Sequence, residues 1–231
     1  MKGTFPSTSY HRTPDESAGQ STRLLPKSAA IMVARRILIL FAHPALHKSR
    51  VNRRLLEGAR PLPGITCRDL YEDYPDFNID VKREQADLLE NDLIIFQHPF
   101  FWYSCPAILK EWQDLVLEYG FAYGTGGTHL QGKSFLQVIT AGGAVDSYRR
   151  EGYNYYSIRE FLTPFEQTAR LCGMHYLPPF LVPGTIRFQN EAAIEPYVAS
   201  YRQALEALRD NLLGPDNLHH AKIINEVLTS T

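Results

Sequence analysis

The chain has 231 residues, of which 44% are hydrophobic, so it can form one ample core without a second domain. Its 24 Lys and Arg nearly balance 25 Asp and Glu, and the cations are spread along the chain. Composition therefore gives no argument for a nucleic acid or an anionic membrane as the partner. Three widely spaced cysteines without a C-x-x-C pattern favour neither disulfides nor zinc, and they fit a reducing cytosol.

The beginning of the chain differs in pattern from the rest. Residues 1–34 mix Ser, Thr, Pro and charged residues without a steady apolar period, so we expect a flexible N-terminal extension there and one domain over residues 35–231. The extension has no secretory apolar segment. No apolar run approaches the roughly 20 residues that span a bilayer, so any membrane attachment should be peripheral.

Strand and helix patterns alternate from residue 37 onward. Ile37–Phe41 is a continuous apolar run, typical of a strand that is buried on both faces. Helix signals run from Ser49 to Ala59 and end at Pro61, after which residues 65–70 predict the second strand. Residues 74–80 predict a loop, residues 81–90 a short helix and residues 93–97 the third strand.

The next helix is predicted from Ser104 to Gly120. Its apolar positions fall at i, i+1, i+4, i+7, i+8 and i+11, which forms one continuous stripe. These positions are Ile108, Leu109, Trp112, Leu115, Val116 and Tyr119.

The second half of the chain continues the alternation. Residues 135–140 predict the fourth strand, and a capping-box pattern at residues 163–166 opens a helix that Gly173 would end. Residues 176–182 predict a fifth strand, interrupted by Pro178 and Pro179, and residues 191–213 predict the last helix. Five strands separated by helices predict an α/β fold with a parallel sheet in the order 2-1-3-4-5, whose ligand crevice lies beside strands 1 and 3.

The loop after the first strand leads into a helix. Ser49, Arg50, Val51 and Asn52 would form the opening turn, where backbone N–H groups and the positive end of the helix dipole favour a phosphate. Arg50 adds a positive charge and Ser49 a hydroxyl. The alternative is an ordinary capped helix with solvated charges.

Two histidines in the same loop, His43 and His47, are spaced four residues apart. Pro44 lies between them and argues against a helix that would present both on one face. Since no third ligand is clustered nearby, we expect no metal site.

The loop after the third strand is aromatic. Pro99 precedes Phe100, Phe101, Trp102 and Tyr103, and four consecutive aromatic side chains cannot all point into one core. A flat conjugated ring is a natural ligand for such a loop. An aromatic patch at a dimer interface is the alternative.

The loop after the fourth strand has small residues: Thr140, Ala141, Gly142 and Gly143. The glycines let the backbone approach a ligand closely, although a plain turn is the alternative. Tyr148 could reach back over this loop as a hydrogen-bond donor, or it could be a surface tyrosine. Because the carboxyl ends of parallel strands converge on one crevice, the three loops together predict one ligand site.

These residues, in this order and spacing, resemble the flavodoxin-like NAD(P)H:quinone oxidoreductase family, and most closely the ancillary subunits of glutathione-regulated potassium-efflux systems. The resemblance covers residues 36–185. It depends on Ala42-His43-Pro44 with Ser49 and Asn52, on residues 74–80, on Gln97-His98-Pro99 with Trp102-Tyr103-Ser104, on residues 121–124, and on Cys172-Gly173 with residues 177–180.

The resemblance implies a flavin cofactor, FMN in preference to FAD. His43 and residues 49–52 would hold its phosphate and ribityl end, and residues 99–103 and 140–143 would hold the isoalloxazine. It also implies NAD(P)H as co-substrate and two-electron hydride transfer through the flavin to a quinone. The chain would form a homodimer in which Phe121 and Tyr123 close the partner's site.

The sequence also departs from the family's pattern. Phe101 stands where relatives tend to have glutamine, and Ala141 replaces a threonine, although backbone N–H contacts to the flavin could survive both changes. The catalytic candidates that the resemblance implies are Tyr148, which matches the family's tyrosine, and Asn154, at the position of its histidine. Asn154 can donate a hydrogen bond but cannot take up a proton near neutral pH.

Two other functions stay open at this point. The chain could be a regulatory flavoprotein that binds and activates a glutathione-gated potassium-efflux antiporter, or a flavin-free interaction module that kept the fold. The expected location is the cytoplasm, with peripheral attachment at the inner membrane face as an alternative.

Overall fold

The computed structural model describes residues 34–218 and 220–228, which belong to one compact unit, Met32–Thr231. The expected N-terminal extension lies, apart from Ala34, outside the described residues. Among the described residues, no helix combines the length and the apolar composition needed to cross a membrane.

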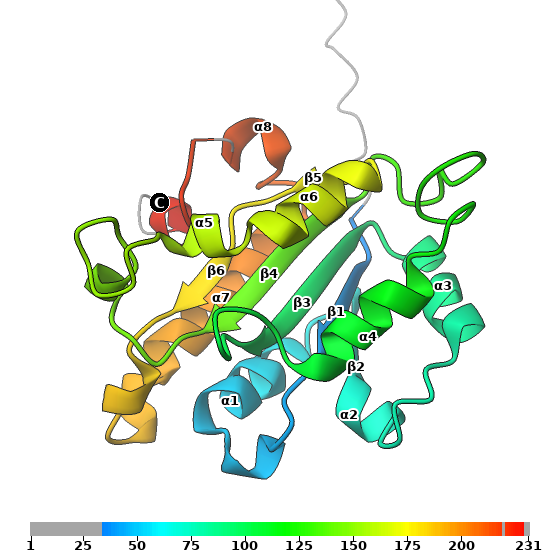
Figure 1. Ribbon diagram of the computed structural model, residues 1–231. Helices are drawn as coiled ribbons and strands as arrows, with labels where there is room; N and C mark the ends of the chain where they lie inside the picture. The colour runs from blue at the N-terminus through cyan, green and yellow to red at the C-terminus, as the bar shows by residue number, and fades with distance from the viewer. Residues whose placement is uncertain (1–33, 219, 229–231) are drawn as a thin grey trace, which may run out of the picture. The chain divides into compact units, whose positions relative to one another are not determined.

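A parallel sheet forms the centre of this unit (Figure 1). Its strands follow the order β2-β1-β3-β4-β5, and β6 also pairs with β4, so the predicted order 2-1-3-4-5 is confirmed. The register pairs Phe41 with Gln97 and Pro99 with Thr140, which brings the ends of three strands side by side. The strands are β1 (Ile37–Phe41), β2 (Ile65–Asp69), β3 (Leu93–Pro99), β4 (Ser134–Thr140), β5 (His175–Tyr176) and β6 (Phe180–Val182).

Helices cover both faces of the sheet (Figure 1). Successive side chains of β1 point to opposite faces, so Leu38 and Leu40 belong to one buried core while Ile37 and Ile39 belong to the other. The first core includes side chains of α2 (Leu70–Asp73), α3 (Val81–Glu90), α4 (Ala107–Val116), α5 (Ile158–Phe161) and α6 (Thr163–Leu171). The second includes side chains of α1 (Arg50–Ala59), α7 (Glu195–Arg209), α8 (Pro215–Leu218) and α9 (Asn225–Leu228). Two covered faces explain why β1 is continuously apolar.

Helix boundaries differ from the sequence predictions at several places. The predicted helix 104–120 is shorter, because α4 has Pro106 at its N-cap and Leu117 at its C-cap. Tyr119 lies beyond the helix and is 65% exposed, so it does not extend the buried stripe. The predicted helix 191–213 is a 3-10 turn, Glu191–Ala193, followed by α7.

The capping box lies one helix earlier than predicted. Ser157 and Glu160 cap α5 reciprocally, whereas α6 begins at Thr163 without a side-chain cap. The predicted cap at residues 163–166 is therefore wrong, while the helix that opens there and ends before Gly173 is confirmed. The predicted fifth strand is two short strands, because Pro178 and Pro179 offer no N–H groups. β5 pairs at the start of β4 and β6 at its end.

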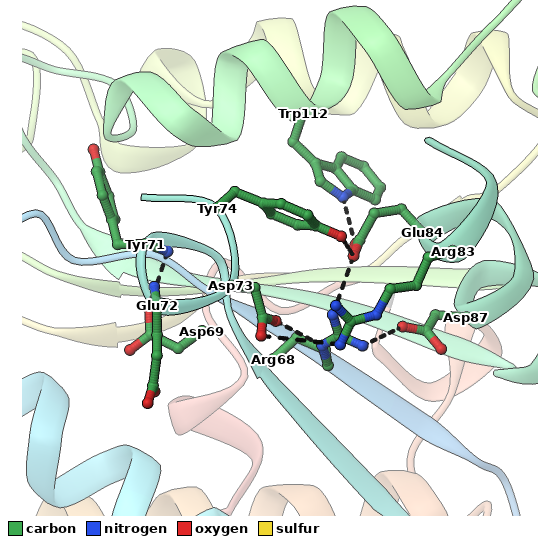
Figure 2. A network of polar contacts seen from close by, with 10 residues as sticks. All are labelled: Arg68, Asp69, Tyr71, Glu72, Asp73, Tyr74, Arg83, Glu84, Asp87 and Trp112. Atoms are coloured by element: carbon green, nitrogen blue, oxygen red, sulfur yellow. Dashed lines mark hydrogen bonds and ion pairs between the residues drawn. The ribbon is translucent and has the colours of Figure 1, made fainter. Parts of the chain in front are cut away.

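A buried carboxylate joins the first helices to α4 (Figure 2). Glu84 is completely buried and accepts hydrogen bonds from Tyr74 Oη (2.7 Å) and Trp112 Nε1 (2.8 Å). Arg68 Nη2 lies 3.4 Å from Glu84 Oε1, and the same guanidinium pairs with Asp73 at 2.8 Å. This arrangement fixes the loop 74–80, whose sequence was prominent in the family resemblance.

The C-terminal segment covers the outer edge of β6. Leu181 N–H donates to Asn225 Oδ1 at 2.9 Å, and Asn225 Nδ2 donates to Leu181 O at 3.1 Å. One side chain therefore satisfies both backbone groups that this edge residue would otherwise expose.

Candidate functional site

A pocket of about 260 Å³ lies at the carboxyl ends of β1, β3 and β4. All three predicted loops contribute to it, so the structure brings most of the predicted site residues together. Its wall consists of His43, Lys48, Ser49, Arg50, Val51, Asn52, Pro99, Phe100, Phe101, Thr140, Gly142, Thr185 and Ile186.

The opening turn of α1 forms the basic side of the pocket. Ser49 is the N-cap, and its Oγ accepts a hydrogen bond from Asn52 N–H at 3.2 Å. The guanidinium of Arg50 donates to Phe188 O and to Gln189 O, the latter at 3.3 Å. These bonds tie the start of α1 to the chain after β6 and hold a cation beside a helix N-terminus.

A buried amide lies beneath this turn. Asn52 is 2% exposed, and its Nδ2 donates to Thr140 Oγ1 at 2.8 Å. Its Oδ1 is buried and has no hydrogen-bond partner among the described residues. Reversing the amide would only exchange the atoms, so one end stays unpaired in either orientation. Such a group costs about 1–3 kcal/mol unless a further partner reaches it.

His43 is a neutral residue at this site. Burial lowers the pKa of its imidazole, and Ala45 N–H donates to its Nδ1 at 3.1 Å. Its ring lies edge-on to Phe101, with 5.8 Å between ring centroids. In the described part of the chain, no group of three or more side chains could hold a metal ion.

Two expected backbone donors are already used within the protein. Phe101 N–H donates to Pro99 O at 3.0 Å, and Ala141 N–H donates to Val182 O at 2.9 Å. Phe101 and Ala141 have no polar side chain, so neither residue offers a ligand a side-chain donor or a free N–H group.

The aromatic loop divides between the core and the surface. Phe100 is buried, while Tyr103 stacks on Phe161 with 5.0 Å between ring centroids. Trp102 is 90% exposed. Trp102 and Tyr103 both have positive φ, 48° and 63°, a backbone strain that is common at functional sites. Neither side chain forms part of the pocket wall.

Four other predicted site residues lie outside the wall. Ala141 is buried, and Gly143 packs against Tyr148, so that a Cβ on Gly143 would lie 3.1 Å from the Tyr148 hydroxyl. Burial raises the pKa of Tyr148, which keeps this hydroxyl protonated as a donor. Asn154 donates its backbone N–H to Ser147 O at 2.9 Å and does not reach the pocket.

Three wall residues were not predicted: Lys48, Thr185 and Ile186. Thr185 N–H donates to Ala141 O at 3.1 Å, which holds the chain after β6 against the third loop. The signal was present in the sequence, because residues 183–186 also follow a strand. The prolines obscured where that strand ends.

The pocket's chemistry fits the phosphate and ribityl end of FMN. Lys48, Arg50 and the first turn of α1 provide the positive charge and N–H groups that a phosphate requires. The unpaired amide end of Asn52 calls for a polar ligand atom, which ribityl hydroxyls can provide.

Known proteins agree with this geometry. Residues 35–205 match the family described as Flavodoxin-like fold. Over 166 residues the chain is 48% identical to the glutathione-regulated potassium-efflux system ancillary protein KefG of Serratia proteamaculans, a match that covers 72% of this chain and 90% of that protein. The solved structure of general stress protein 14 from Treponema denticola, in complex with FMN, is 36% identical with a TM-score of 0.71, covering 75% of this chain and 99% of the other.

A third comparison points the same way. The crystal structure of an NADPH-quinone reductase from P. pentosaceus is 30% identical with a TM-score of 0.67, covering 74% of this chain and 97% of the other. The strand order, the matched residues and these relatives show that the chain belongs to the flavodoxin-like fold family.

Proposed function

We propose that this protein is an FMN-dependent NAD(P)H:quinone oxidoreductase. One observation carries the proposal: the side-chain amide of Asn52 has a hydrogen-bond partner at only one of its two ends. This amide is buried beneath a basic helix N-terminus, in a pocket at the strand ends. Relatives that are described as an FMN complex and as an NADPH-quinone reductase support the same cofactor and reaction class.

Each part of the pocket has a distinct task. The first turn of α1, with Lys48 and Arg50, neutralises the phosphate. Asn52 orients the sugar alcohol, since Gln97 Nε2 donates to Asn52 O at 3.3 Å and thereby fixes the backbone there. Phe100 and Phe101 exclude water from one side of the ring system. FMN, when bound, supplies the two-electron chemistry between a nicotinamide and a quinone.

A regulatory role is the second candidate function. The observation that favours it is the 48% identity to a potassium-efflux system ancillary protein over most of both chains. In this function the protein would bind and activate a glutathione-gated potassium-efflux antiporter. Copurification with such an antiporter, and potassium efflux that requires the protein, would support it independently of the reductase assay.

The cofactor can be tested directly. We expect protein reconstituted with excess FMN or FAD, and then desalted, to retain about one FMN per chain, identified by mass spectrometry of the released flavin. Steady-state assays with NADH and NADPH should then show quinone reduction. Loss of all flavin absorbance on desalting would contradict both functions that involve a flavin and favour a flavin-free module.

The phosphate end can be tested with two arginines of the same helix. Arg50→Ala should weaken FMN binding about ten- to a hundredfold, the effect of one charge-assisted hydrogen bond. Arg53→Ala is the matched control, because Arg53 lies outside the pocket wall and pairs with Glu57 at 3.8 Å. Equal affinities in the two variants would remove Arg50 from the site.

A further inference from the structure

A second pocket, of about 350 Å³, shares no wall residue with the proposed flavin site. It lies where α6 and β5 meet the C-terminal segment that contains α8. Its wall combines charged side chains with apolar ones. This volume lies within the range of about 300–1,000 Å³ that is usual for small-molecule sites.

The charged part of the wall is built around Arg159. Its Nη2 lies 3.4 Å from Glu166 Oε2, and its guanidinium carbon lies 5.0 Å from the centroid of the Tyr176 ring. Its Nη1 is buried and has no hydrogen-bond partner among the residues that the structure describes. A guanidinium that is held by a carboxylate and an aromatic ring, and still has an unused buried N–H group, lacks one acceptor.

The charges that line the pocket favour an anion. Glu166 also accepts a hydrogen bond from Arg170 Nη2 at 2.6 Å, so one carboxylate is shared by two guanidinium groups. Two ionisable wall residues remain: His175, which is exposed, and Tyr176, whose pKa burial raises, so that it stays uncharged. Two arginines against one glutamate leave the pocket with a net positive charge.

The remaining wall residues of the pocket are apolar. They are Met174, Leu177, Pro178, Pro215, Leu218 and Ala221. Tyr176 offers only its ring, because its hydroxyl donates to Gln137 Oε1 at 2.8 Å. An inorganic anion would leave this apolar wall without a partner, whereas an organic anion with an apolar body would contact both kinds of side chain.

Part of the wall lies outside the shared family region. The family match ends at residue 205, and Pro215, Leu218 and Ala221 come after it. Leu218 is completely buried, so this wall is anchored in the core. The pocket is therefore closed by a segment that the matched family region does not include.

We propose that this pocket binds a small organic carboxylate. Arg159 is the main contact, because its guanidinium is a charged donor whose Nη1 still lacks an acceptor within the described residues. Arg170 adds charge, and the apolar wall takes the ligand's hydrocarbon body. The proposal does not depend on the proposed flavin chemistry, since the two pockets are separate.

Calorimetric titration and amide chemical-shift mapping of the FMN-loaded full chain can test this, with benzoate as the probe. Benzyl alcohol, a neutral compound of similar shape, should bind at least about tenfold more weakly, as should inorganic phosphate. The perturbed amides should lie at residues 159–178 and 215–221. If benzyl alcohol binds as tightly as benzoate, or if no saturable binding occurs, the proposal is wrong.

Two variants locate the site. Arg159→Lys keeps the charge but loses the planar guanidinium and its Nη1 donor, so benzoate affinity should fall about tenfold. Ala221→Phe keeps both arginines and fills the pocket, so binding should be lost. Arg36→Lys is the control, because Arg36 is an exposed arginine that pairs with Glu90 at 3.7 Å, away from this pocket.

The thermal midpoint of each variant shows whether it has folded. Benzoate binding that survives in both folded site variants would overturn the assignment. Loss of binding in Ala221→Phe together with full affinity in Arg159→Lys would overturn the role of Arg159. Neither result would bear on FMN binding, which is measured separately by its absorbance.

Discussion

Adjacent polar residues of β3 point to opposite faces of the sheet, and each begins a buried hydrogen-bond chain. On one face, Tyr201 Oη donates to Gln97 Oε1 at 3.0 Å, and Gln97 Nε2 reaches the backbone of Asn52. On the other face, Gln137 Nε2 and His98 Nε2 are 3.3 Å apart, and His98 Nδ1 is 3.0 Å from Pro99 O. Both chains end at residues of the proposed flavin pocket, which explains why polar side chains occur in a fully buried strand.

His98 should make the protein less stable in acid. Burial lowers its pKa from 6.5 to about 4, and a proton on Nε2 would face the Gln137 donor. Between these values the unfolded chain binds more protons than the folded one, so stability is lost as the pH falls below 6.5. The loss attributable to His98 should reach about 2 kcal/mol near pH 5.

Urea unfolding of the wild type and of His98→Gln at about pH 7 and pH 5 measures this difference. The variant should lose less stability over that range. His43, whose pKa is also lowered by burial, contributes in the same direction in both proteins and cancels in the comparison. Identical pH dependence in the two proteins would show that His98 does not stay neutral by burial.

Tyr148 should matter for the reaction more than for flavin binding. Its hydroxyl lies against Gly143, and its ring lies edge-on to Phe100 with 5.9 Å between centroids, so it is next to the pocket without lining it. A donor there helps most when negative charge develops, so Tyr148→Phe should keep FMN affinity and slow flavin reduction by NAD(P)H about tenfold.

Stopped-flow reduction measures that rate. Tyr156→Phe is the control, since the Tyr156 ring also packs edge-on to Phe161, at 5.6 Å between centroids, whereas the side chain nearest Gly143 is Tyr148. A Tyr148 variant that is reduced as fast as the wild type would leave this tyrosine a packing role only.

At the scale of elements, Glu84 determines how α2 and α3 join α4 (Figure 2). Glu84→Leu would leave the Tyr74 hydroxyl and the Trp112 indole N–H buried without an acceptor, while Arg68 would keep Asp73 and Asp87. We expect a loss of about 3 kcal/mol or more, because unpaired buried groups keep their full desolvation cost.

Urea unfolding followed by tryptophan fluorescence can measure this loss, since Trp112 is one of two tryptophans. Glu84→Gln, which keeps one acceptor oxygen, should lose less than Glu84→Leu. Glu90→Gln breaks an exposed ion pair with Arg36 and should change stability by less than about 1 kcal/mol. Equal stability of the Glu84→Leu and Glu90→Gln variants would contradict the role given to the buried carboxylate.

The sequence predicted helices and strands well where neighbouring residues determine the structure. It predicted them poorly where contacts between distant residues determine it. The β1 run needs two covered faces, and the sequence shows this directly. α4 ends where the chain must turn, at its C-cap Leu117. The regular spacing of apolar residues continues to Tyr119, so it does not show this end. The partner of Asn52 is Thr140, 88 residues away, so the buried amide pair was beyond sequence reasoning.

At the scale of the whole molecule, Phe121 and Tyr123 lie at the end of the sheet opposite the proposed flavin pocket. Phe121 stacks on His129 with 5.0 Å between centroids, and residues 129–133 lead directly into the start of β4. The pocket residue Thr140 is at the other end of this seven-residue strand, about 20 Å away at roughly 3.3 Å per residue. These two aromatics therefore lie far from the pocket of their own chain, and the expected closure of a flavin site by them would require a second copy.

This separation makes the expected homodimer testable by subunit complementation. Arg50→Ala damages the pocket, while the double variant Phe121→Ala and Tyr123→Ala damages the loop that should close the partner's pocket. Homodimers of either variant should bind FMN weakly at both sites. A heterodimer, purified through two different tags, combines the intact pocket of one chain with the intact loop of the other at one site and both defects at the second. It should therefore bind about half the FMN of the wild type with normal affinity. Two equally weak sites in the heterodimer, or a monomeric wild type in sedimentation at assay concentration, would contradict the shared site.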